Sequence, residues 1–124
     1  MDCDNVDWAC DGGWMLDAFD WTKENGIVDW DAYPRQYIGM KSRCQANDSM
    51  PRFYNKGGHE EDNVSNHRLK ELLTKSPVGA AIKSNYSCMA FYRDGVVTES
   101  DCHCSDPKKD EVDHAITVVG YGKS

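Results

Sequence analysis

The chain is organised around the stretch Val112-Asp113-His114-Ala115-Ile116-Thr117-Val118-Val119-Gly120-Tyr121-Gly122. This stretch places a histidine directly before an apolar run rich in β-branched residues, a pattern typical of a buried strand. His114 would then stand at the mouth of the strand, where an imidazole can change charge near neutral pH and transfer a proton. On its own, a histidine before a strand is more often structural than catalytic.

Composition excludes several classes of protein. Hydrophobic residues make up 40% of the 124 residues, so a small packed core is feasible. The formal net charge of −7 argues against a nucleic-acid partner, because phosphates require a surface rich in Lys and Arg. No apolar run approaches the length of a membrane-crossing helix, so we expect no membrane span.

Cysteines and acceptor motifs indicate the compartment. Six cysteines in so short a chain favour an oxidising environment. Asn47-Asp48-Ser49, Asn63-Val64-Ser65 and Asn85-Tyr86-Ser87 match the acceptor motif for N-linked glycans. Together these features predict a glycoprotein of the secretory pathway, either lysosomal or vacuolar, or extracellular.

Several segments follow the order of motifs found in one family. Asp113-His114-Ala115 leads into a Val-Gly-Tyr-Gly ending, while Asp2-Cys3-Asp4 and Cys10-Asp11-Gly12-Gly13 open the chain. Tyr33-Pro34 and Phe91-Tyr92-Arg93-Asp94-Gly95 lie between them. Over nearly its whole length the chain resembles papain-like, cathepsin-type cysteine proteases. The resemblance implies a partial papain-like α+β fold: residues 1–57 would end a helical left domain, and residues 58–124 would form much of a β-rich right domain carrying the histidine.

The activity implied is that of a cysteine-type endopeptidase, which needs a cysteine, a histidine and an asparagine. The resemblance assigns the histidine to His114. The nucleophile signature, Cys-Gly-Ser/Ala-Cys-Trp/Tyr, is absent, and its expected place is roughly 15–35 residues before Met1. The asparagine segment would follow Ser124. We therefore expect a fragment of such a protease that is inactive by itself; the alternative is a protease-derived binding or structural module that has lost catalysis.

Substrate contacts are also implied by the resemblance. The second glycine of the Gly-Gly pair, here Gly13, would offer backbone hydrogen bonds to a peptide, as an added strand does. The residues assigned to substrate binding are Gly12, Gly13, Trp14, Met15, Ala81, Val112, Asp113 and Ala115. Without the resemblance, the glycines predict a simple turn before a helix, and core packing explains Trp14 and Met15 equally well.

The implied partners are peptide or protein substrates and the remainder of the protease chain. A propeptide and cystatin-type inhibitors are further partners known for the family. No cofactor is expected, because the chemistry of the cysteine and histidine pair requires none.

The resemblance pairs Cys3 with Cys44. This disulfide closes a long loop and would contribute about 4 kcal/mol in the chain-entropy model. Cys10 matches another family cysteine, whose partner would lie upstream of this chain.

The remaining cysteines leave alternatives open. Cys88 can pair with Cys102 or with Cys104. Because His103 lies between two cysteines, a zinc site is a further alternative. The chain has no Cys-x-x-Cys, and oxidised thiols cannot bind zinc, so we expect no metal.

Periodicity and turn residues predict the other elements. His59 and His67 lie in polar sequence and are expected at the surface. The predicted helices cover residues 14–24 and 64–75, with Ser65 as the N-cap of the second helix. The predicted extended segments cover residues 27–34, 78–82 and 92–97, the last around an Asp94-Gly95 turn.

Overall fold

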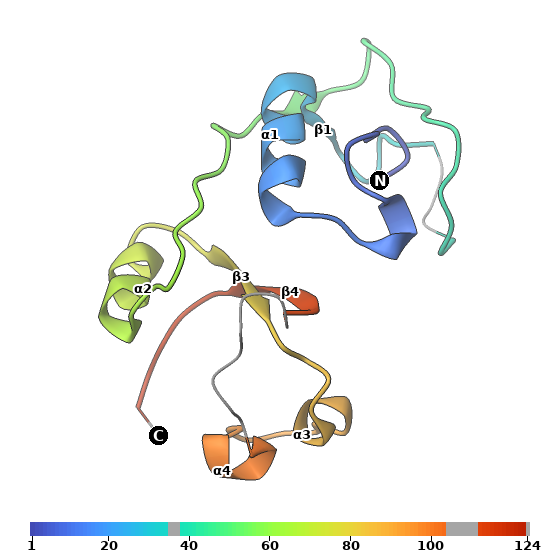
Figure 1. Cartoon of the computed structure of the whole chain (residues 1–124). Helices are drawn as coiled ribbons and strands as arrows, with labels where there is room; N and C mark the ends of the chain where they lie inside the picture. The colour runs from blue at the N-terminus through green and yellow to red at the C-terminus, as the bar shows by residue number, and fades with distance from the viewer. Residues whose placement is uncertain (35–37, 104–111, 124) are drawn as a thin grey trace. The chain divides into compact units, whose positions relative to one another are not determined.

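In a computed structural model of the chain, the structure describes residues 1–34, 38–103 and 112–123. The chain forms two compact units, Met1–Asp62 and Asn63–Ser124, each of which is described by itself. Figure 1 shows the helices and strands of both units. The sequence-based division at residues 57 and 58 stays a prediction.

The first unit is built on the helix α1, Met15–Asn25. The helix ends at Gly26, which has a φ of 70° and donates its N–H to the Thr22 carbonyl at 2.9 Å. Glycine adopts this left-handed conformation without a steric cost, and a Cβ here would also press against Arg52 and Tyr54. The predicted helix and its stop are therefore confirmed, with each boundary shifted by one residue.

The predicted extended segment 27–34 is mostly wrong. Only Ile27–Val28 forms a strand, β1, which pairs antiparallel with β2, Arg52–Phe53. After β1 the chain turns, because the Asp29 side chain accepts the Asp31 N–H at 3.0 Å and the Asp29 carbonyl accepts the Tyr33 N–H at 3.1 Å. A side chain that hydrogen-bonds the backbone two residues onward favours a turn over a strand.

The disulfide between Cys3 and Cys44 is confirmed, with the two Cα atoms 4.6 Å apart. The neighbouring Asp2 accepts two hydrogen bonds. The Asp2 carboxylate accepts the Ser42 N–H at 2.9 Å and the Tyr33 hydroxyl at 3.1 Å. The start of the chain is thus held against residues more than 30 positions away by one covalent bond and several polar ones.

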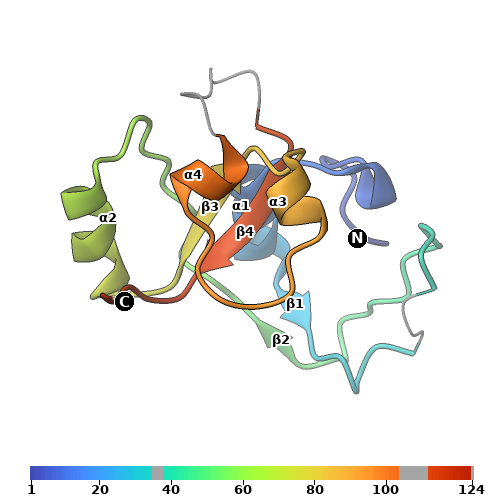
Figure 2. The same ribbon diagram turned by 90° about the horizontal axis from the view of Figure 1, so that it is seen from below.

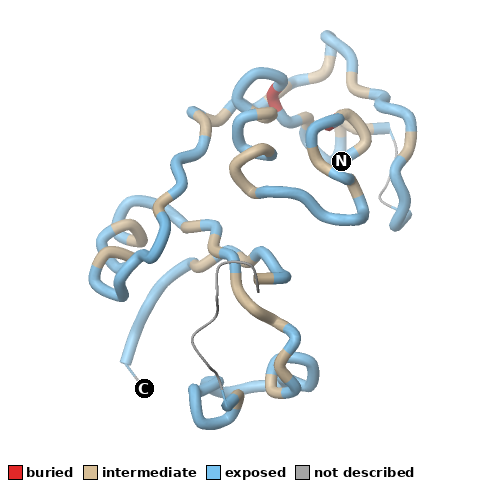
Figure 3. Tube along the Cα trace, in the orientation of Figure 1, coloured by how far each residue is buried: buried red, intermediate tan, exposed pale blue. Residues whose placement is uncertain are grey.

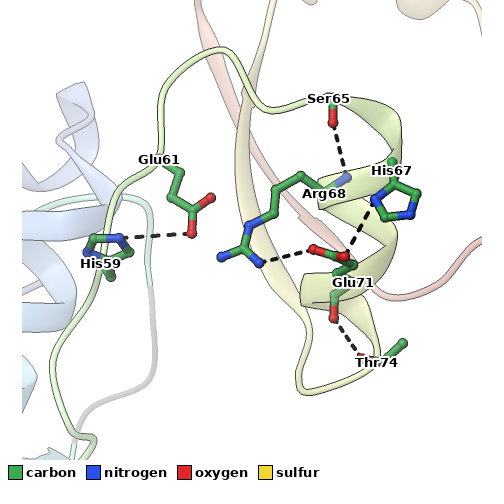
Figure 4. A network of polar contacts seen from close by, with 7 residues as sticks. All are labelled: His59, Glu61, Ser65, His67, Arg68, Glu71 and Thr74. Carbon is green, nitrogen blue, oxygen red and sulfur yellow. Dashed lines mark hydrogen bonds and ion pairs between the residues drawn. The ribbon is translucent and has the colours of Figure 1, made fainter.

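The second unit opens with the helix α2, Asn66–Leu73. Ser65 is its N-cap, as predicted, and its hydroxyl accepts the Arg68 N–H at 3.2 Å. Figure 4 shows Arg68 and His67 both reaching Glu71, at 3.2 and 3.5 Å. The His67 side chain is 86% exposed, and in the first unit the His59 side chain is 82% exposed, so both histidines lie at the surface as predicted.

The strands β3, Val78–Ile82, and β4, His114–Val118, form the second antiparallel pair. Their register joins Val78 to Val118 and Ile82 to His114. Both strands occur where the sequence predicts them. The expected burial of β4 is wrong, however, because only Ile116 and Val118 are even half-buried. A two-stranded sheet of this kind leaves most of its surface open to solvent.

Residues 83–103, which follow β3, contain two short helices, α3 (Ser87–Ala90) and α4 (Glu99–Cys102). The two helices lie side by side in Figure 2 and are joined by a Cys88–Cys102 disulfide. The expected β-structure at 92–97 is wrong: these residues form a bend closed by the Tyr92 hydroxyl, which donates to the Gly95 carbonyl at 2.9 Å. Cys104 lies outside the described residues.

Exposure is high along the whole described chain, as Figure 3 shows. Asp4 and Gly26 are the only buried residues in the ranges that the structure describes, and no hydrophobic side chain there is buried. The packed core that the composition made feasible is therefore not found among the described residues. Each sheet has only two strands, so backbone pairing and disulfides hold the described segments together in place of a core. No described helix is long and apolar enough to cross a bilayer.

We expect Ser65→Ala to lower the free energy of unfolding by about 1 kcal/mol in the full-length protein, because the Arg68 N–H loses its acceptor. Urea titration of the two proteins measures this difference. Ser65→Thr keeps the hydroxyl and should match the parent. Asn63→Gly removes the same glycan acceptor motif at a residue whose φ of 53° glycine also adopts, so an equal loss in that variant would contradict the assignment.

Candidate active site

His114 occupies the first position of β4, directly opposite Ile82 at the end of β3. The strand pairing fixes its backbone, while its side chain is exposed to solvent. An imidazole held in this way can exchange protons without leaving its position. The sequence-based placement of His114 at a strand end is confirmed, and its catalytic role stays a prediction.

Asp113 fixes the backbone directly before His114 by hydrogen bonds. Its N–H donates to the Ile82 carbonyl at 3.0 Å, and its carboxylate accepts the Ser84 N–H at 2.6 Å. Asp113 thus closes the open end of the β3–β4 pair from both its main chain and its side chain. The hydrogen bonds from Ser84, the amide of Asn85 and the nearby His114 hold the pKa of the Asp113 carboxyl below its ordinary value.

Two small residues assigned to substrate binding face each other across the sheet. Ala81 and Ala115 are paired in the register, and both are exposed. Because side chains alternate along a strand, these alanines lie on the face opposite to that of His114 and Ile82. Val112 is half-buried just before β4. Val112, Asp113 and Ala115 are thus close to His114 in the chain, and the strand pairing brings Ala81 next to Ile82, the partner of His114.

The other residues assigned to substrate binding gather in the first unit, beside η1, a short 3₁₀ helix at Ala9–Asp11. They line a hollow of about 320 Å³ together with residues from the start of the chain. Gly12 has a φ of 106°, which favours glycine. The full lining is Met1, Asp4, Asp7, Ala9, Gly12, Gly13, Trp14, Met15 and Ala18.

Asp4 anchors this hollow. Its carboxylate accepts the N–H groups of Val6 and Asp7, at 2.8 and 3.5 Å. Burial opposes its ionisation, yet these hydrogen bonds prevail and keep the pKa of the Asp4 carboxyl below its ordinary value. Lys41 adds a bond from its ammonium group to the Asp4 carbonyl at 3.1 Å. The floor of the hollow is therefore a charged, hydrogen-bonded turn.

The described cysteines are either disulfide-bonded or lie in the first unit. Four of them form the two disulfides, and Cys10 is a free, exposed thiol in the first unit. Within the same residues, no three His, Cys, Asp or Glu side chains come together in a way that could hold a metal ion. Cys102, one neighbour of His103, is bonded to Cys88 and so is not available as a zinc ligand.

The profile of the papain family cysteine protease domain matches residues 1–124, the whole chain. This chain belongs to the papain family of cysteine proteases. Membership of this family confirms the predicted α+β papain-like fold, of which this chain holds a part.

Similar papain-family proteins come from animals and plants. The chain is 33% identical to mouse (Mus musculus) cathepsin K over 98% of its length, covering 36% of that protein. It is 36% identical to the KDEL-tailed cysteine endopeptidase CEP2 of Arabidopsis thaliana over 98% of its length, covering 32% of that protein. The chain thus spans about a third of the length of these curated relatives.

A solved structure supports the fold. The chain is similar to the Carica candamarcensis cysteine protease CMS1MS2, determined in complex with E-64, with a TM-score of 0.77 and 27% identity. The match covers 98% of this chain and 53% of that one. The chain therefore has the fold of part of a papain-like cysteine protease.

Two residues with a role in these papain-family segments were missed by the sequence reasoning. Ser84 holds Asp113 across 29 residues, and the Asp7 carboxylate accepts the Trp14 N–H at 2.8 Å. Neither belongs to a motif, since serine and aspartate are common in loops. An acidic side chain shortly before the glycine pair was a signal that Asp7 could have a role, but nothing in the sequence identified Trp14 as its partner.

The lowered pKa of Asp113 predicts a pH-dependent contribution to stability. A depressed folded-state pKa gives stability that is fully present above the ordinary value of 3.8 and lost as pH falls through the folded-state value. We expect the stability difference between the full-length protein and its Asp113→Asn variant to be constant near neutral pH and to shrink as the pH falls below the ordinary carboxyl pKa of 3.8.

Urea titrations of both proteins at successive pH values measure this difference. Asparagine keeps an oxygen that can accept the Ser84 N–H, so the comparison isolates the charge. Asp94→Asn, in the bend between α3 and α4, is the control for loss of an ordinary surface carboxylate. A difference that does not change over the acidic range would contradict the assignment.

Proposed function

We propose that this chain is part of a cysteine-type endopeptidase and supplies its catalytic histidine, His114, with part of the peptide-binding cleft. The observation that carries the proposal is the fixed, exposed His114 at the start of β4 in a papain-family chain. The nucleophilic cysteine and the orienting asparagine would come from the part of the protein that this chain does not cover. The plant relative named an endopeptidase supports the same reaction class.

In the proposed reaction His114 moves a proton twice. It first takes the proton of the cysteine, whose thiolate attacks the peptide carbonyl carbon, and it then gives that proton to the leaving amine. Water then hydrolyses the resulting thioester: His114 takes a proton from the attacking water and returns it to the cysteine sulfur as the C–S bond breaks. The two hydrogen bonds of Asp113 would keep the imidazole in place through both steps.

Peptide or protein substrates would be bound by the residues already assigned. Gly13 would pair its backbone with an extended peptide, while Trp14, Met15, Ala81, Val112 and Ala115 would contact substrate side chains. The exposure of Gly12, Gly13 and Trp14 leaves this segment accessible to a ligand. E-64, present in the related plant structure, is a suitable probe for the thiol of the full-length protein.

The isolated chain should not hydrolyse peptides. Its disulfide cysteines cannot form a thiolate, and exposed Cys10 belongs to the η1 loop of the first unit. We further propose that the full-length protein acts in a lysosome or vacuole or outside the cell, where disulfides persist. A propeptide or a cystatin-type inhibitor would occupy the same cleft as the substrate.

We expect His114→Ala to lower kcat/KM of the full-length protein by about 10²-fold or more, because proton transfer in both steps is lost. A fluorogenic peptide assay measures the effect, with the concentration of intact protein fixed by absorbance. Folding should be retained, since the imidazole is exposed and makes no described hydrogen bond.

His67→Ala is the matched control, because His67 is also an exposed histidine but lies on α2 beside Glu71. Its kcat/KM should equal that of the parent. Near-normal turnover in His114→Ala would remove His114 from the mechanism. A full-length protein with no turnover and no reaction with E-64 would instead favour the inactive protease-derived module.

A further inference from the structure

Asp7 closes the loop that carries the glycine pair. Its Oδ1 atom accepts the N–H of Trp14, seven residues onward, at 2.8 Å. Inside the loop, the Trp8 N–H donates to the Gly12 carbonyl at 3.0 Å. The carboxylate therefore joins the two ends of the segment that contains Gly12 and Gly13.

Asp7 also lies directly against Gly13. A Cβ atom built on Gly13 would overlap the carboxylate and the Cβ of Asp7. At Gly12, by contrast, a Cβ would meet nothing within 4 Å. Glycine is therefore needed at position 13 because the Asp7 side chain occupies the space that a larger residue would take.

Few other contacts hold this loop. Gly12 and Gly13 are exposed, and Trp14 is 55% exposed. Asp7 is half-buried, and its own N–H is held by the carboxylate of the buried Asp4. A series of bonds thus runs from Asp4 through Asp7 to Trp14, and it fixes a loop that burial alone does not fix.

We infer that Asp7 is a positioning residue that sets the affinity of the Gly13–Trp14 segment for an extended peptide. The inference rests on the proposed function, in which Gly13 binds the substrate backbone. A peptide that pairs with a disordered strand must order that strand, and a strand already held in one conformation binds more tightly. The described contacts of Asp7 are with Asp4, Gly13 and Trp14 of the first unit, so we expect it to act on binding and not on chemistry.

The test uses the full-length protein with Asp7→Ala, Asp7→Asn and Asp11→Ala. Loss of the acceptor in Asp7→Ala should raise KM about 10-fold and leave kcat within about twofold. Asp7→Asn keeps an acceptor oxygen and should restore most of the affinity. Asp11→Ala removes the same charge from the same loop without removing a described side-chain hydrogen bond, so its KM should not change.

Two readouts separate this inference from the proposed function. Hydrogen exchange of the Trp14 amide should be faster in Asp7→Ala than in the parent. The Kd of a peptide with a non-cleavable bond should rise in the same variant. A protein that shows no turnover but an Asp7-dependent Kd would retain the inference and remove the proposed endopeptidase. An unchanged Kd, a fall in kcat alone, or an equal effect in Asp11→Ala would overturn the inference.

Gly13→Ala, alone and in a double-mutant cycle with Asp7→Gly, gives a second test that does not depend on the folding of Asp7→Ala. In the parent, the new methyl group would displace Asp7, so Gly13→Ala should weaken peptide binding. In the Asp7→Asn background the same overlap exists, and the loss should be similar. In an Asp7→Gly background the overlapping carboxylate and Cβ are both gone, and Gly13→Ala should cost less. Additive effects across the cycle would overturn the inference.

Discussion

The antiparallel pairing of β3 with β4 is the constraint on which the candidate active site depends. It brings residues 78–82 against residues 114–118, more than 30 positions away, and it fixes which face each side chain takes. A shift of one residue would move His114 to the face now occupied by Ala115. The bonds of Asp113 to Ile82 and Ser84 lie at the end of this pairing and guard against such a shift.

Covalent and polar contacts replace a hydrophobic core in both units. In the first unit, the start of the chain is held by the Cys3–Cys44 disulfide and by hydrogen bonds to Asp2. In the second unit, the Cys88–Cys102 disulfide joins α3 to α4. Exposed aromatic residues such as Trp30 and Phe91, at 68% and 82%, contribute little burial energy here.

Both predicted functional regions use one physical device. A carboxylate accepts backbone N–H groups and thereby fixes a segment whose side chains are exposed. Asp113 does so beside His114, and Asp7 does so beside Gly13. Hydrogen bonds to a charged acceptor are stronger than those between neutral groups. They can therefore hold a backbone segment in place where few side chains are buried. The segments stay accessible to a ligand while their backbones remain ordered.

The sequence by itself determined the features that depend on neighbouring residues. The stop of α1 at Asn25-Gly26, the Ser65 cap, and the strands β3 and β4 all follow from local propensity and hydrogen bonding. The motifs at both ends predicted the family and, through it, the Cys3–Cys44 pair.

Only the tertiary structure decided the features that join distant residues. It chose Cys102 as the partner of Cys88, formed a bend where Asp94-Gly95 suggested a hairpin, and left β4 exposed. It also joined Ser84 to Asp113 and Asp7 to Trp14. The physical reason is that burial and hydrogen-bond partners depend on which segments meet in space, and local sequence does not encode those meetings.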